Sequence, residues 1–155
     1  MSIALQKVRL IDSHTHLWDR QFDANRDEAI RRMRERDIAA IQVGTERSTS
    51  ELALRLAEAH DYFWAAVGQH PTDTKKVFDA DAFEKLAVHP NVVAIGECGL
   101  DYYRSDESDR ARQAELFRTQ IRLAKKVGKP LMIHCRPSLR QGFGGQAAAY
   151  SMDAY

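Results

Sequence analysis

The sequence of 155 residues is long enough for one domain with a substantial hydrophobic core. Hydrophobic residues make up 44% and charged residues 29%, which is typical of a globular protein. The formal net charge of +1 excludes the strong basic excess that by itself indicates nucleic-acid binding, so any phosphate binding has to be local.

Two cysteines, Cys98 and Cys135, are too few for a disulfide framework and favour a reducing compartment. Both are expected to pack against neighbouring side chains rather than bind a metal. The N-terminus lacks a secretory pattern, and no segment approaches the roughly 18 apolar residues of a membrane span. We therefore expect a cytoplasmic protein without membrane contact, and no obligate protein partner is evident.

Strand-like and helix-like patterns alternate along the chain. Apolar runs predict five buried strands, at 8–11, 38–44, 62–68, 92–96 and 130–133. Apolar residues at helical spacing predict four helices between them, at 23–36, 48–57, 81–88 and 107–127. This series predicts an α/β fold in which right-handed crossovers join parallel strands.

Side chains that bind metals follow these strands. His14 and His16 come just after the first strand, and because side chains alternate along an extended chain, their imidazoles should project to the same side. His70 follows the third strand, Glu97 the fourth and His134 the fifth. Because chemistry collects at the carboxyl ends of parallel strands, we predict a divalent-metal site there. The alternative is that these groups form structural hydrogen bonds and ion pairs.

Four segments resemble the TatD family of metal-dependent deoxyribonucleases, within the amidohydrolase superfamily. They are IDSHTHL at 11–17, VGQHP at 67–71, AIGECGLDYY at 94–103 and PLMIHCR at 130–136. Many hydrolases share the His-x-His alone, whereas Gly-Glu-x-Gly-Leu-Asp followed by Ile-His-x-Arg is far more specific. The resemblance runs from about Val8 to Pro137.

The resemblance implies a TIM-type (β/α)8 barrel with two divalent metal ions, Mg²⁺, Mn²⁺ or Zn²⁺, at the strand ends. His14 and His16 would bind one ion and His134 the second, while Glu97 would bridge both as the catalytic residue. The family takes a further histidine from strand six and an aspartate from strand eight, and neither follows His134 in a matching position.

A complete barrel usually takes about 250 residues, so the sequence supplies roughly five of eight strands. We therefore expect the N-terminal part of such a barrel at 1–137 and an irregular tail at 138–155, the result of truncation, a frameshift or recombination.

The activity that the resemblance implies is hydrolysis of DNA phosphodiester bonds by a water that two metals activate. The expected substrate is single-stranded DNA or a 3′ end, attacked as by a 3′-5′ exonuclease. Two alternatives stay open. One is an amidohydrolase-like enzyme acting on a small ester, amide or phosphoester, and the other is an inactive or unstable barrel remnant that lacks the last ligands.

His70 and Arg136 are the candidate substrate-binding residues. His70 would contact a substrate phosphate or cap its own loop. The guanidinium of Arg136 matches phosphate in a bidentate way, although an ion pair with Asp101 or another acid is the alternative. Tyr102 and Tyr103 could stack on bases of a single strand, but packing on the barrel rim is the more ordinary expectation.

Overall fold

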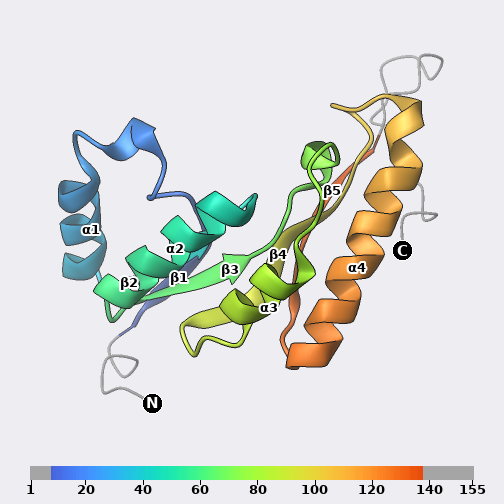
Figure 1. Ribbon diagram of the computed structural model, residues 1–155. Helices are drawn as coiled ribbons and strands as arrows, with labels where there is room; N and C mark the ends of the chain where they lie inside the picture. The colour runs from blue at the N-terminus through green and yellow to red at the C-terminus, as the bar shows by residue number, and fades with distance from the viewer. Residues whose placement is uncertain (1–7, 138–155) are drawn as a thin grey trace.

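The computed structural model describes residues 8–137 and contains a five-stranded sheet in the order β1-β2-β3-β4-β5 (Figure 1). The strands are β1 (Leu10–Thr15), β2 (Ile38–Val43), β3 (Phe63–Val67), β4 (Val92–Asp101) and β5 (Leu131–Arg136). The helices are α1 (Arg26–Glu35), α2 (Arg47–Ala59), α3 (Ala80–Ala87) and α4 (Arg110–Val127). Three short 3-10 turns precede α1, α3 and α4, namely η2 (Arg20–Phe22), η3 (Pro71–Asp73) and η4 (Glu107–Asp109).

Every strand pairs in parallel with the next strand along the chain. A helix lies between each pair, which is the arrangement expected for five of the eight strands of a TIM-type barrel. Within residues 8–137, no helix is long and apolar enough to cross a membrane. The cytoplasmic location, the domain boundary at 137 and the absence of an obligate partner stay predictions of the sequence, and the tail at 138–155 lies outside the described residues.

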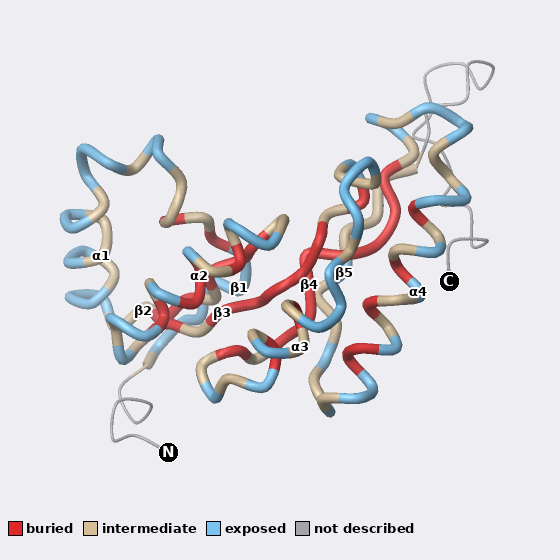
Figure 2. Tube along the Cα trace, in the orientation of Figure 1, coloured by how far each residue is buried: buried red, intermediate tan, exposed pale blue. Residues whose placement is uncertain are grey.

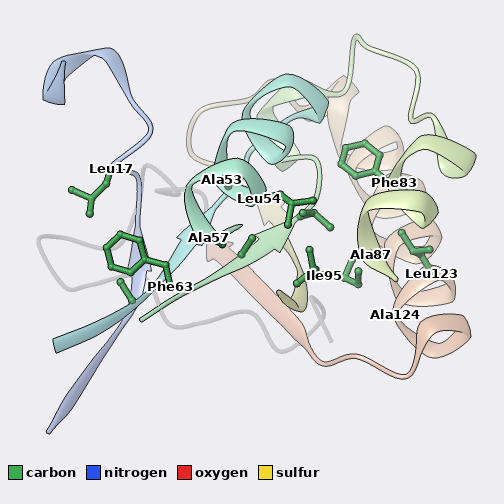
Figure 3. Packing of buried hydrophobic residues seen from close by; sticks show 14 residues of the cluster. Leu17, Ala53, Leu54, Ala57, Phe63, Phe83, Ala87, Ile95, Leu123 and Ala124 are labelled. Atoms are coloured by element: carbon green, nitrogen blue, oxygen red, sulfur yellow. The ribbon is translucent and has the colours of Figure 1, made fainter. Parts of the chain in front are cut away.

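The main hydrophobic core lies between the sheet and its helices (Figure 3). Small side chains on the strands, such as Ala40 and Ala65, let the helices approach closely. The helix side of this core is built from α2, α3 and α4, through Ala53, Leu54, Ala57, Phe83, Ala87, Leu123 and Ala124. This packing fixes the helices against the strands that carry the predicted site.

A second apolar cluster includes only strand residues. It joins Val43, Ala66 and Ala94 with the partly buried Ile41 and Met132, from four adjacent strands. In Figure 2 most of β3 and most of β4 are buried. Both faces of the central strands are therefore shielded, as expected of parallel strands in an α/β fold.

Three strands run further than the sequence predicts. β1 runs to Thr15 and β5 to Arg136, so His14 and His134 lie within their strands rather than after them. β4 runs to Asp101 instead of ending at Gly96, because it pairs with β5 in a register that places Gly99 opposite His134. This register places Glu97 inside a strand, in the middle of the sheet edge that carries the site.

Local side-chain and backbone chemistry ends two of the helices. The N-cap of α2 is Glu46, whose side chain forms a reciprocal capping box with Thr49. Gly128 ends α4 in the left-handed conformation with a φ of 67°, as expected of a C-terminal glycine cap.

Candidate functional site

The two histidines of β1 lie side by side, as their spacing predicts. Their Nε2 atoms are 3.2 Å apart. His16 Nδ1 lies 2.8 Å from the carbonyl oxygen of Val43 at the end of β2. Because a carbonyl can only accept, Nδ1 carries the proton in the neutral ring and Nε2 presents its lone pair. That tautomer is the one that a metal ligand at Nε2 requires.

Glu97 stands at the centre of the histidines. Its Oε2 is 3.4 Å from His14 Nε2, and its Oε1 is 2.9 Å from His134 Nδ1 and 3.9 Å from His70 Nε2. Two groups of potential metal ligands result, each with its ligand atoms within 4.8 Å of one another: His14, His16 and Glu97 form one, and His70, Glu97 and His134 the other. A single carboxylate shared by two groups has the placement of a bridging ligand.

His134 lies between two carboxylates. Besides its contact with Glu97, its Nε2 is 3.0 Å from Asp101 Oδ2. The Asp101 carboxylate is fully buried and also accepts hydrogen bonds from the backbone N–H groups of Tyr103 and Arg104. Burial opposes its ionisation, but the Arg104 N–H and the hydrogen bond with His134 hold the pKa of Asp101 below its ordinary value.

Two carboxyl groups at the two ring nitrogens are satisfied by two protons on His134, by one ring proton and a proton on one carboxyl group, or by one ring proton and a metal cation. An imidazole that donates Nε2–H to Asp101 and binds a cation at Nδ1 beside Glu97 satisfies every partner. The imidazole and carboxylate donors of both groups suit first-row divalent metals, so the described residues fit the ions that the resemblance implies.

His70 caps η3 and faces the same centre. Its Nδ1 accepts a hydrogen bond from the backbone N–H of Thr72 at 3.2 Å, and its ring centroid is 4.4 Å from that of His134. Burial lowers the pKa of His70, although the carboxylate of Glu97 opposes this shift. The loop cap that the sequence offered as an alternative is therefore present, and Nε2 still points toward the site.

Arg136 lies over an aromatic ring rather than against an acid. Its guanidinium carbon is 4.9 Å from the ring centre of Tyr103, and no ion pair of Arg136 occurs among residues 8–137. The alternative partner, Asp101, is engaged with His134 instead. Tyr103 is 54% exposed, whereas Tyr102 packs under the Arg110 guanidinium at 4.9 Å.

An open cavity of about 730 Å³ lies over these residues. All four histidines and Glu97 line it, together with the cationic side chains of Lys76, Arg104 and Arg136. Lys76 forms ion pairs with Glu46 and Asp73, so its charge is partly neutralised. Arg104 and Arg136 have no such partner within the described chain, and they leave the cavity able to hold an anion.

The cysteines stand apart from the ligand groups. Cys98 is buried beside Leu100 and Phe117, and burial raises the pKa of its thiol to about 12. Cys135 is half-buried at the cavity wall. Within residues 8–137, neither belongs to a group of three potential metal ligands.

Asp101 is the site residue that sequence reasoning passed over, because it was considered only as a partner for Arg136. The sequence contains a signal for it: Glu97, Gly99 and Asp101 occupy every second position of one strand, so the two carboxylates face the same side. The sequence analysis also leaves out two buried glutamines of α4, Gln113 and Gln120, because polar residues on a helix ordinarily face solvent.

Comparison with known proteins supports the same assignment. A family model described as TatD related DNase matches residues 11–143. The uncharacterized metal-dependent hydrolase YabD of Bacillus subtilis (strain 168) is 41% identical over 130 residues, which is 82% of this chain and 51% of the relative. The 3′-5′ ssDNA/RNA exonuclease TatD of Musicola paradisiaca (strain Ech703) is 40% identical over 131 residues, or 82% of this chain and 49% of the relative.

A solved structure agrees with the fold. The TatD homolog YJJV from Escherichia coli K12 superposes with a TM-score of 0.74 at 30% identity, covering 83% of this chain and 51% of that chain. The likeness confirms the predicted partial barrel. The chain spans about half the length of the curated relatives and of the solved structure that it matches.

Proposed function

Because the chain belongs to the TatD related DNase family, we propose that its site serves the metal-dependent hydrolysis of DNA phosphodiester bonds. The preferred substrate is a single strand or a 3′ end, cleaved with 3′-5′ polarity, in keeping with the name of the exonuclease relative. The observation that carries the proposal is the position of Glu97, whose two oxygens face different histidines.

The described residues suit two divalent ions, Mg²⁺, Mn²⁺ or Zn²⁺. His14 and His16 would hold one, His134 the other, and Glu97 would contact both. When bound, such ions lower the pKa of a water and polarise a phosphoryl oxygen. The protein's own part is orientation: the Val43 carbonyl fixes the ring of His16, and Asp101 fixes the ring of His134.

His70 and Arg136 are proposed to bind the substrate phosphate. Because Nδ1 of His70 accepts from Thr72 N–H, Nε2 carries the proton in the neutral ring and can donate to a phosphate oxygen in the cavity. Arg136 offers a planar guanidinium held over Tyr103, which suits bidentate contact with phosphate. Both side chains line the same cavity as Glu97.

The rival candidate is that these 155 residues bind metal but do not turn over substrate. Its support is that the chain spans about half of its relatives, while the resemblance calls for two further ligands. An amidohydrolase-like activity on a small ester, amide or phosphoester would use the same ligands. Of these candidates, only the nuclease releases nucleotides from DNA.

The test is Mg²⁺- or Mn²⁺-dependent nucleotide release by the purified chain from single-stranded DNA labelled at one end. Early release of the 3′ label, abolished by Glu97→Gln, is the expected result. Glu58→Gln is the matched control, because Glu58 is a surface partner of His89 remote from the cavity. Release that persists in Glu97→Gln contradicts the proposal, and metal binding without release supports the rival.

A further inference from the structure

Two glutamines of α4 make the same contact with the backbone of two different strand ends. Gln113 Oε1 accepts from Asp101 N–H at 2.8 Å, and its Nε2 donates to the Asp101 carbonyl at 3.0 Å. Gln120 Oε1 accepts from Gln69 N–H at 2.9 Å, and its Nε2 donates to the Gln69 carbonyl at 2.8 Å. Each side-chain amide thus pairs with both backbone groups of one residue, as a neighbouring strand would.

Packing alone does not account for these two residues. Both are completely buried, and their spacing of seven residues places them on one face of α4, two turns apart. A buried amide is costly unless its hydrogen bonds are made, and an apolar side chain of the same size would remove these partners from the backbone N–H and carbonyl groups of Asp101 and Gln69. The hydrogen bonds are therefore the property that distinguishes glutamine at these positions.

We call each of these pairs of hydrogen bonds a clamp. The two clamped residues, Asp101 and Gln69, each connect directly to a histidine of the site. Asp101 carries the carboxylate that bonds His134 Nε2, and Gln69 immediately precedes His70. The Gln69 side chain continues this connection, because its Nε2 donates to the carbonyl oxygens of Asp73 and Lys76 in the loop beside the cavity. A displacement of either clamped residue would therefore move an imidazole of the site.

The surrounding chain leaves room for both clamps. A Cβ at Gly68 would lie 2.7 Å from Gln120 Oε1 and 2.6 Å from the Cα of Gly96, so a larger residue at 68 would push the clamp apart. Next to the other clamp, the Ser105 hydroxyl accepts from Gln113 Nε2 at 2.6 Å and donates to the Asp101 carbonyl.

We propose that Gln113 and Gln120 are positioning residues through which α4 sets the geometry of the site. Gln113 holds Asp101 and thereby orients His134, while Gln120 holds Gln69 and thereby places His70. The inference rests on the proposed function only for the chemistry that these imidazoles perform. The two clamps act on different strand ends, so their effects should be separable.

The test uses Gln113→Met and Gln120→Met in the full chain. Methionine keeps the length and most of the volume of glutamine but forms neither hydrogen bond. In Gln113→Met, the Asp101 amide should exchange with solvent at least about ten-fold faster while the Gln69 amide keeps its rate, and Gln120→Met should show the reverse. These rates are read residue by residue by NMR and need no substrate.

Metal affinity provides the second readout. Gln113→Met should weaken the binding of Mn²⁺ at His134 and Glu97 by about 5- to 10-fold, less than the loss of a residue that itself bonds a ligand, because Gln113 acts on His134 only through Asp101. Gln120→Met should change that affinity by less than about three-fold, because it acts on His70, which the proposal assigns to substrate. If the Met variants do not fold, the corresponding Gln→Glu variants replace them. A glutamate keeps the side-chain oxygen that accepts from the backbone N–H but loses the side-chain N–H that donates to the backbone carbonyl.

Leu123→Ala is the control, because Leu123 lies on the same helix in the main core and its apolar side chain forms no hydrogen bond with Asp101 or Gln69. It should accelerate both amides together. The proposal is overturned if each glutamine variant also accelerates both amides equally, or if Gln113→Met binds Mn²⁺ like the wild type. If the wild type itself binds no Mn²⁺, the proposed function fails and amide exchange alone decides on the clamps.

Discussion

Asp101→Asn isolates what one buried carboxylate contributes to the proposed binding of a metal by His134. The change keeps the size of the side chain, but the single oxygen of asparagine cannot both accept from the Tyr103 and Arg104 N–H groups and face the Nε2–H of His134. It removes the negative charge that makes the present 3.0 Å contact a charge-assisted hydrogen bond. The variant therefore tests the electrostatic orientation of His134 without opening a cavity.

The magnitude follows from the kinds of hydrogen bond. A hydrogen bond to a charged group contributes about 1.5–3 kcal/mol, and asparagine cannot replace it while its oxygen stays bonded to the Tyr103 and Arg104 N–H groups. Because each 1.4 kcal/mol is about ten-fold in an equilibrium constant, Mn²⁺ affinity at His134 and Glu97 should fall by about 10- to 100-fold. Asp101 is fully buried, so solvent should not replace the lost charge.

The assay is a titration of Mn²⁺ at neutral pH in which free Mn²⁺ is counted by its EPR signal. Asp106→Asn is the matched control, since it is the same substitution on an exposed carboxylate five residues further along. It should leave the affinity unchanged. An unchanged affinity in Asp101→Asn, or an equal loss in the control, would refute the role assigned to the Asp101 carboxylate.

Three further outcomes are expected. Gly99→Ala should lower the free energy of unfolding, measured in urea, by more than about 2 kcal/mol, because a Cβ at this position overlaps the backbone of β5 and the φ of 133° is strained for alanine. Gly128→Ala is the control: its Cβ meets open space, so the substitution should cost only about 1 kcal/mol. Because folding lowers the pKa of Asp101, its carboxylate stabilises the fold above about pH 4, and this stabilisation is lost on further acidification. The difference in unfolding free energy between the wild type and Asp101→Asn should therefore shrink as the pH falls, and a difference that widens contradicts the prediction. At pH 8, iodoacetamide should label Cys135 much faster than Cys98, since a thiol pKa of about 12 leaves only about 10⁻⁴ of Cys98 as thiolate. Equal labelling of the two cysteines, read by peptide mapping, would be inconsistent with the burial of Cys98.

The strand positions and the pair of histidines could be predicted because both depend on local pattern. Alternation along an extended chain is enough to place His14 and His16 together. The length of β4 could not be predicted in the same way. Its last residues pair with β5 across more than thirty positions of sequence, as in the register of Gly99 opposite His134, and no local feature announces that partner.

The glutamines of α4 show where pattern reasoning reaches its limit. The apolar periodicity predicts the helix at 107–127 but gives Gln113 and Gln120 no place on its buried face. Their burial depends on backbone groups of Asp101 and Gln69, which are 12 and 51 residues away. A polar residue at a core-facing helical position is nevertheless a readable signal, because such a residue needs a partner.

The central claim, that Glu97 serves two metal ions, is tested most directly by counting Mn²⁺ ions bound per chain. The wild type should bind two, with an EPR spectrum broadened by coupling between them, and Glu97→Gln should weaken both sites together, since its oxygens contact both groups. His14→Ala should weaken only one. One bound ion in the wild type, or two uncoupled ions whose affinities survive Glu97→Gln, would contradict the shared carboxylate.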